Sequence, residues 1–187
     1  MTLDLLLARL LILLGVGFLV ANLRIVLQFV RYQRLRRTAI LTWPGRRPPL
    51  YGLLLTLGMV LAGLVIVKLW FQGRPPVDAF GESMMMLYYG VALPLSLRIG
   101  RGFYEEGIWA ETGFVAYATI GGLSWREDPQ VTLVLIDRER QFARRLEVPD
   151  RHYGAARRVL RDKIAAHDIH FTGKSLDLGE HDDRDVV

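Results

Sequence analysis

The chain has 187 residues, enough for one or two domains, and 51% of them are hydrophobic, a high share for a soluble protein of this size. Charge is divided unevenly between the two halves. Residues 1–97 carry ten basic and three acidic side chains (net +7), whereas residues 98–187 carry 14 basic and 16 acidic ones (net −2). The basic character therefore belongs to the apolar half, which argues against nucleic-acid binding. The lack of cysteine excludes disulfides, thiolate metal sites and cysteine nucleophiles.

Residues 3–23 form a first apolar run, interrupted by only three polar side chains. A helix of this length spans roughly 30 Å, the thickness of the hydrocarbon core of a bilayer. We place the first transmembrane helix at residues 3–30 and expect it to continue as a basic extension to about Arg37. We expect no cleaved signal peptide, because the run is too long and no small-residue cleavage site follows it.

A second apolar run occupies residues 50–71, and a loop at residues 31–49 with six arginines and no acid precedes it. Arginine and tryptophan beside apolar runs are typical of a bilayer interface. The side chains expected at the interface are Arg31, Arg34, Arg36, Arg37, Trp43, Arg46, Arg47, Trp70, Arg98 and Arg101.

A third run, residues 77–97, is less apolar because Asp78 and Glu82 lie near its start. We assign it as a third span; a re-entrant or interfacial helix and a buried helix of the soluble part stay open as alternatives. Lys68, near the end of the second run, is expected to pair with Glu82 or Asp78 across the short turn between the two runs.

The arginines also predict an orientation. The positive-inside rule places the loop at residues 31–49 in the cytoplasm and the N-terminus in the periplasm. If the third run spans, Arg98 and Arg101 return to the cytoplasm, and the soluble part follows them there. This topology is that of a multi-pass membrane protein.

Two pairs of small residues lie four positions apart within the apolar runs, Gly17 with Ala21 and Gly58 with Ala62. Such pairs allow two helix backbones to approach closely. We therefore expect these four residues to lie at helix-packing contacts.

From Phe103 onward the hydrophobic period changes from helical to two, which is typical of strands. The strand at residues 130–137 is apolar on both faces, which predicts a central position in a sheet. A helix is expected at residues 150–167, with Asp150 as its N-cap. An extended segment at 169–178 and an acidic, disordered tail at 179–187 would follow. The expected strands are residues 103–106, 108–111, 114–117, 120–126, 130–137 and 141–148.

The phrases GFYEEGIW at residues 102–109 and FVAYATI at residues 114–120, with Trp125 and the closing helix, resemble bacterial pleckstrin-homology-like (PH-like) domains attached to short membrane helices. The resemblance covers about residues 98–168. It implies a scaffold domain in residues 98–178 of a multi-pass protein of a bacterial inner membrane, and it names no ligand. A full domain of that family has seven strands, whereas about six are evident in this sequence.

No residue pattern indicates a catalytic, cofactor or metal site. Residues 171–175 (FTGKS) resemble the end of a phosphate loop, but Asp168 occupies the position of its first glycine, so a turn is the better interpretation. Metal-capable groups occur only at the helix end and in the tail, and the three consecutive methionines at 84–86 point to different helix faces. The metal-capable groups are His167, Asp168, His170, His181, Asp182 and Asp183.

The sequence thus predicts an α+β membrane protein with three N-terminal spans and a small antiparallel sheet domain closed by a helix. We expect a non-catalytic accessory, scaffold or assembly subunit whose partners are membrane lipids and other integral membrane subunits, not nucleic acid. The alternative is a membrane-surface sensor that binds anionic lipid or a peptide through Arg157, Arg158 and Arg161. A transporter or enzyme is least favoured, because the spans carry almost no polar residue at mid-depth.

Overall fold

The computed structural model describes residues 3–138 and 142–169 of the chain. The fold is mixed α+β and forms two compact units that alternate along the chain. The helical unit comprises Met1–Arg37 and Pro44–Gly100, and the sheet unit comprises Thr38–Trp43 and Arg101–Val187. The chain therefore passes from one unit to the other three times.

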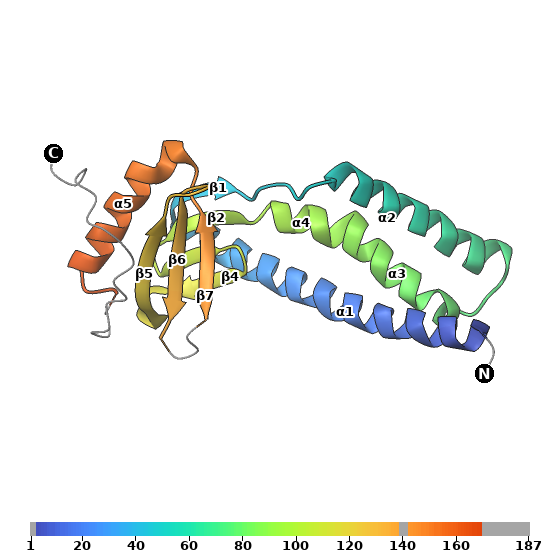
Figure 1. Cartoon of the computed structure of the whole chain (residues 1–187). Coiled ribbons are helices and arrows are strands. Elements are labelled where there is room, and N and C mark those ends of the chain that lie inside the picture. Colours follow the sequence, from blue (N-terminus) through green and yellow to red (C-terminus); the bar gives the residue numbers. More distant parts are fainter. Residues whose placement is uncertain (1–2, 139–141, 170–187) are drawn as a thin grey trace. The chain divides into compact units, whose positions relative to one another are not determined.

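The helical unit contains three long helical stretches (Figure 1). The first is α1 (Leu3–Leu35), and the second is α2 (Tyr51–Ile66) with the π turn Val67–Phe71. The third consists of the 3-10 turn Pro76–Ala79, α3 (Phe80–Leu87), the π turn Tyr88–Ala92 and α4 (Leu93–Leu97). α3 packs against both α1 and α2.

The π turn in the third stretch lies just before Pro94. Proline has no N–H to donate to the preceding turn, and its ring clashes with the carbonyl four residues earlier. A π turn is a common way to absorb such an interruption without ending the helix. The third stretch therefore continues as one helical path past Pro94 to the end of α4.

Glycines set the close contacts between the helices. A Cβ at Gly81 would clash with the carbonyl oxygen of Leu11, and one at Gly15 would lie 2.7 Å from the ring of Phe80. A Cβ at Gly58 would lie 3.1 Å from a backbone nitrogen of the π turn. A side chain at Gly81 or Gly15 would force a neighbour to shift, and one at Gly58 would be tight, so glycine allows the backbones to approach.

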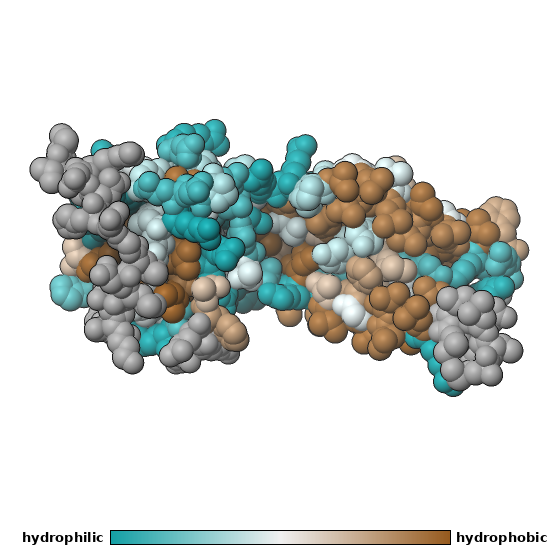
Figure 2. Space-filling view, viewed as in Figure 1, coloured by the Kyte–Doolittle hydropathy of each residue, from teal (hydrophilic) through white to brown (hydrophobic). Residues whose placement is uncertain are grey.

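Two helical stretches of the described chain, Arg9–Thr38 and Tyr51–Phe71, are long and apolar enough to cross a membrane by length and composition. Most of their large apolar side chains are exposed, including Leu13 at 70% and Met59 at 69%. Figure 2 shows this apolar surface in brown over the helices, while teal dominates the described part of the sheet unit in the same view. The third stretch is not among the helices that meet the same criteria.

The sheet unit holds two antiparallel sheets and one helix (Figure 1). The first sheet has the order β1-β2-β3-β4 and the second the order β5-β6-β7. The elements are β1 (Ala39–Pro44), β2 (Gly100–Tyr104), β3 (Gly107–Ala110), β4 (Gly113–Ala116), β5 (Ile120–Arg126), β6 (Thr132–Asp137), β7 (Ala143–Glu147) and α5 (Asp150–Ala165). The predicted central position of the strand at residues 130–137 is confirmed, because β6 pairs with both β5 and β7.

The first strand of the sheet unit comes from a segment that was predicted to be loop. β1 lies between α1 and α2 in the chain and is the neighbour of β2. Its inward side chains are Leu41 and Trp43, whereas Ile40 and Thr42 are exposed. The alternation in this segment was a strand signal, and it was obscured by the arginines on both sides of it.

One core lies between the two sheets and α5. Phe103, Ile108, Leu133 and Leu146 are completely buried, and Ala156 of α5 packs with them. Transfer of apolar surface from water into this core is the main favourable term in the folding of the unit.

The predicted helix at the end of the unit is confirmed, although it ends two residues earlier than expected and the prediction of Asp150 as its N-cap is wrong. α5 is capped by Pro149, and Asp150 lies inside the first turn without a side-chain capping bond. Of the predicted extended segment at 169–178, only Ile169 is described, and it is buried in the core. The tail at 179–187 lies outside the described residues.

Candidate functional site

The main polar contact of the helical unit joins the second and third helical stretches. The Lys68 ammonium donates to Glu82 Oε1 and to the carbonyl oxygen of Asp78, the latter at 3.3 Å. Glu82 is only 7% exposed, and its other oxygen, Oε2, accepts no hydrogen bond. The structure thus brings together Lys68 and Glu82, and Asp78 contributes its backbone rather than its carboxylate.

A second polar contact, absent from the sequence interpretation, ties α1 to α3. Asn22 Nδ2 donates to the carbonyl oxygen of Met84 at 3.0 Å. The buried Oδ1 of Asn22 has no hydrogen-bond partner. An amide in an apolar run is a signal for such a contact, because an unpaired amide is costly in an apolar environment.

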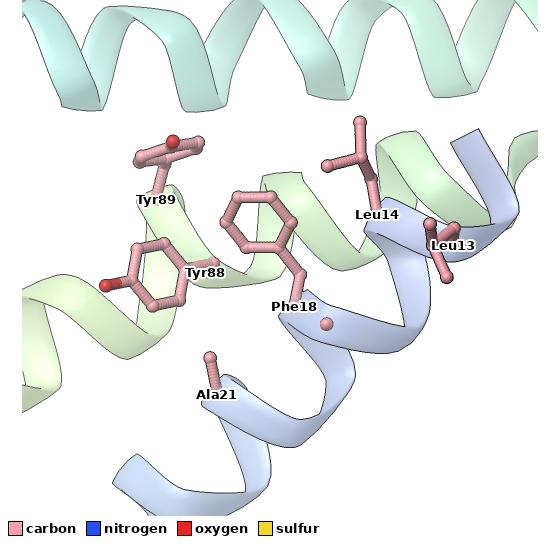
Figure 3. Close-up of a pocket in the computed structure, with 7 residues that line it drawn as sticks. Leu13, Leu14, Phe18, Ala21, Tyr88 and Tyr89 are labelled. Atoms are coloured by element: carbon pink, nitrogen blue, oxygen red, sulfur yellow. The ribbon is translucent and has the colours of Figure 1, made fainter. Parts of the chain in front are cut away.

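Three aromatic rings form a cluster between α1 and the third stretch (Figure 3). Phe18 projects from α1 towards Tyr88 and Tyr89, with ring centroids 5.2 and 5.8 Å away. The two tyrosine rings are perpendicular to each other, with centroids 5.2 Å apart. Edge-to-face arrangements of this kind add to the energy of simple burial.

A groove of about 470 Å³ opens beside this cluster (Figure 3). We call it the ring groove; it is lined by Leu13, Leu14, Gly17, Phe18, Ala21, Tyr88 and Tyr89. The predicted small-residue pair Gly17 and Ala21 therefore lies along the groove. Within the chain, the close contact on α1 is made by Gly15 instead, since nothing lies within 4 Å of a Cβ built at Gly17.

The second small-residue pair lies differently. Gly58 is buried against the third stretch, and Ala62 is half-buried on the same helix. Gly58 thus lies at a helix contact within the chain, whereas Gly17 offers its open side to the surroundings.

Residues expected at the membrane interface separate into two groups. Trp70 is 85% exposed. The exposed arginines are Arg31, Arg34, Arg36, Arg37, Arg46, Arg47 and Arg98. Trp43 requires a correction: it is buried in the core of the sheet unit, where its Nε1 donates to the carbonyl oxygen of Glu147 at 3.1 Å. Arg101 is half-buried and lies 3.5 Å from the Glu111 carboxylate.

The outer side of α5 is basic. Arg157, Arg158 and Arg161 are all exposed, as expected from their spacing. The Arg157 guanidinium lies 5.6 Å from the centre of the Tyr153 ring, and Arg161 Nε lies 3.8 Å from an Asp162 oxygen. Partial burial raises the pKa of the Tyr153 hydroxyl. The Arg157 charge lowers this pKa, and the Glu127 charge raises it.

Among the described residues of the sheet unit, Tyr117 has a strongly raised pKa. Its hydroxyl donates to the carbonyl oxygen of Tyr104 at 3.0 Å, and the side chain is 3% exposed. Burial raises the pKa of Tyr117 well above its ordinary value, and the nearby Asp168 carboxylate raises it further. Lys163 lies 5.1 Å from the centre of the ring, donates to the carbonyl of Glu105, and pairs with Asp168 at 2.9 Å.

The described residues contain no group of three or more histidine, aspartate or glutamate side chains that could hold a metal ion. His167 and Asp168 lie at the end of α5, whereas His170 and the tail groups His181, Asp182 and Asp183 lie outside the described residues. The segment at 171–175, interpreted as a turn, also lies outside them.

Comparison of the chain with protein-family models, with curated proteins and with solved structures finds no match.

Proposed function

We propose that the protein is a non-catalytic accessory or assembly subunit of a larger complex in a bacterial inner membrane. The helical unit would insert in the bilayer and pack against other membrane subunits, and the sheet unit would dock a partner in the cytoplasm. The single observation that carries this proposal is the contrast in burial: α1 and α2 expose their apolar side chains, whereas the sheet unit encloses a core of its own.

A third membrane crossing is part of this proposal, and strand pairing supports it. β1 follows α1 and precedes α2, and its neighbour in the sheet, β2, follows α4. If α2 carries the chain across the bilayer, the chain must cross back before β2 can reach β1. The helical residues available for this return are 76–97, and a helix of that length spans roughly 33 Å.

Charge supports the proposed orientation. The segment from residue 31 to residue 47 and the end of α4 with Arg98 would both lie on the side of the sheet unit, since β1 and β2 belong to it. The positive-inside rule assigns that side to the cytoplasm. The turn after α2 and the N-terminus would then lie in the periplasm.

We also propose that the sheet unit is a PH-like domain. A four-stranded and a three-stranded antiparallel sheet closed by a C-terminal helix support this assignment. β1 would be the seventh strand of such a domain, in addition to the six strands β2–β7 that follow α4. A fragment beginning at residue 98 would lack β1 and Trp43, so experiments on this unit require the full chain.

The topology can be tested with single cysteines, because the natural chain has none. Gln72→Cys lies in the exposed turn after α2, and Gly154→Cys lies on α5 at a site where an added Cβ meets nothing within 4 Å. In intact cells, a membrane-impermeant maleimide should label Gln72→Cys and spare Gly154→Cys until the cells are opened. Labelling of Gly154→Cys in intact cells would contradict the proposed cytoplasmic sheet unit.

The assembly role can be tested by extracting the full chain from its native membranes in mild detergent. Multi-angle light scattering should then give a protein mass well above the 21.3 kDa of one chain, with further polypeptides in fixed ratio to it. A monodisperse particle of one chain alone would contradict the role of an assembly subunit.

The exposed arginines of α5 favour a second candidate, a surface sensor of anionic lipid. Neutralising Arg157, Arg158 and Arg161 in the full chain reconstituted into vesicles would distinguish the two. If the protein is a sensor, phosphatidylglycerol vesicles protect α5 of the wild type from proteolysis better than phosphatidylcholine vesicles do, and the arginine variant loses this difference. If the protein is an assembly subunit, the proteolysis of α5 is the same in both kinds of vesicle, for the wild type and for the variant.

A further inference from the structure

The side of α5 that points away from the core carries three exposed arginines, Arg151, Arg158 and Arg161. They are seven and three residues apart along the helix, so they lie on one helix face. We call these three residues the α5 arginine face. Arg157 is left out of it, because its guanidinium already lies against the Tyr153 ring.

The arginine face is open and keeps a net positive charge. Gly154 lies between Arg151 and Arg158, is exposed, and has nothing within 4 Å of a Cβ built on it, so another chain can approach the helix closely there. Asp162 lies 3.8 Å from Arg161 Nε, but the two side chains are 74% and 77% exposed. A pair so exposed is weak. α5 as a whole carries five basic and two acidic side chains.

The chain passes out of the described residues at a fixed point beside α5. Ile169 is 4% exposed and belongs to the same core as Leu160 of α5. Asp168, just before it, donates its backbone N–H to the carbonyl oxygen of Lys163 at 3.0 Å, and its carboxylate pairs with the Lys163 ammonium at 2.9 Å. The residues that follow Ile169 therefore start from an anchored position at the end of α5.

The acidic tail, residues 179–187, has the reach and the charge to meet the arginine face. Glu180 is eleven residues beyond Ile169, and an extended chain of that length covers up to roughly 36 Å. α5 has 16 residues and is roughly 24 Å long, so the tail can reach all three arginines. The tail has a net charge of −3, opposite to the +3 of α5. Its acids are Glu180, Asp182, Asp183 and Asp185.

We propose that the acidic tail binds the α5 arginine face of the same chain, with its carboxylates paired to Arg151, Arg158 and Arg161. Each exposed pair is weak by itself. The covalent connection compensates, because it holds the tail near the face at an effective concentration of about millimolar. The tail of a second copy is a poorer occupant, since it lacks this connection.

The contact would make the tail a built-in competitor for the basic side of α5. An anionic ligand that binds there would first have to displace the tail. The proposal goes beyond the assembly role, because the contact lies within the sheet unit and needs neither a bilayer nor a partner subunit. Its failure would leave the assembly role standing.

The contact can be tested by NMR of the full chain in micelles of an uncharged detergent. A nitroxide attached to Val186→Cys, in a chain with no natural cysteine, weakens the amide signals of residues close to it. At about 0.01 M salt, where the Debye length is about 30 Å, the signals of Arg151, Gly154 and Arg158 should be roughly twofold weaker than after reduction of the nitroxide. At about 1 M salt, where the Debye length is about 3 Å, they should recover. Weakening that does not depend on salt, or none at low salt, would overturn the proposal.

A pair of matched variants separates the arginine face from general charge effects. Arg158→Gln/Arg161→Gln should abolish the weakening at low salt. The control Arg126→Gln/Arg145→Gln removes two exposed arginines from β5 and β7 of the same unit and should keep it. The amide signals of the strands report whether each variant is folded. An equal loss in both variants would overturn the proposed face.

A charge swap and a mixed sample identify the partner. Arg158→Glu/Arg161→Glu should abolish the weakening, and the further changes Asp182→Lys/Asp183→Lys should restore it; no restoration would contradict direct pairing. In a mixture of nitroxide-labelled chains with unlabelled, isotope-enriched chains, the enriched signals should keep their intensity. Weakening in the mixture would assign the tail to a neighbouring copy and overturn the proposal.

Discussion

The helical unit and the sheet unit differ in where they place apolar side chains of the same type. Trp70 of the helical unit is 85% exposed, whereas Trp43 of the sheet unit is 5% exposed. Leu13 of α1 is 70% exposed, and Leu133 of β6 is completely buried. The sheet unit hides apolar surface from water, while the helical unit presents it outward.

The difference matches the proposal that the helical unit lies in a bilayer and the sheet unit in water. Outward apolar surface is costly in water at roughly 25 cal/mol per Å², and the proposed bilayer would remove that cost for the exposed leucines of the helical unit. In lipid the apolar side chains provide little attraction between helices, and close backbone packing takes over. The glycines at the contacts with α3 and the buried Lys68–Glu82 pair are consistent with that change.

The largest expected effect is a difference in stability between variants of Trp43 and Trp70. Trp43→Ala should destabilise the sheet unit by about 3–5 kcal/mol, because it removes a buried indole and its hydrogen bond to Glu147. Trp70→Ala is the matched control and should leave this unit unchanged. Denaturant unfolding in micelles, followed by the emission of Trp109 and Trp125, measures both. A loss below 1 kcal/mol for Trp43→Ala would contradict the placement of β1 in the core.

The second effect compares ion pairs. Glu82→Ala leaves the Lys68 ammonium without its carboxylate and should destabilise the helical unit by about 3 kcal/mol. Glu111 is the partner of Arg101 and is more exposed than Glu82, so Glu111→Ala should lower the stability of the sheet unit by about 0.5 kcal/mol or less. Thermal unfolding of each variant in micelles measures the two losses. The double swap Lys68→Glu/Glu82→Lys should recover part of the loss, and no recovery would argue against a direct pair.

The third effect compares glycines inside the helical unit. Gly81→Ala should cost about 2 kcal/mol, because the new Cβ meets the Leu11 backbone, which cannot move aside locally. Gly17→Ala should be neutral or stabilising, since nothing lies within 4 Å of its Cβ and alanine favours the helix. Thermal unfolding in micelles compares the two. Equal losses would mean that α1 and α3 do not make the contact described.

The smallest effect is a pH dependence confined to the sheet unit. The folded state holds the Tyr117 proton more tightly than the unfolded state, because burial raises the pKa of this hydroxyl above its ordinary value. Stability is therefore complete below about pH 10 and falls above it, by at most about 1.4 kcal/mol per pH unit from this group. Tyr117→Phe should be less stable near neutral pH, having lost the bond to Tyr104, and should lack this alkaline slope. Urea titrations between pH 8 and pH 11 measure the alkaline slope of stability. An unchanged slope in Tyr117→Phe would assign the pH dependence to another group.

Much of the division into elements was predictable from the sequence. The apolar runs, the change of period near residue 103, the β5 boundaries and the central position of β6 follow from the hydropathy of adjacent residues. These signals are local, because a helix or strand buries a repeating subset of its own side chains. The closeness of Lys68 and Glu82 also followed from local geometry, since a short turn separates them.

Other features depended on partners far away in the chain. Trp43 lies among arginines between two apolar runs, and only its pairing strand and the Glu147 carbonyl reveal it as a core residue. Gly15 and Gly17 look alike in sequence, yet the angular position of α3 around α1 leaves one buried and the other open. The ring groove likewise requires residues of α1 and Tyr88 and Tyr89 together. The sequence alone determined which segments are apolar and which periodicity each has; only the tertiary structure decided which faces meet, because packing depends on distances between residues that no local pattern encodes.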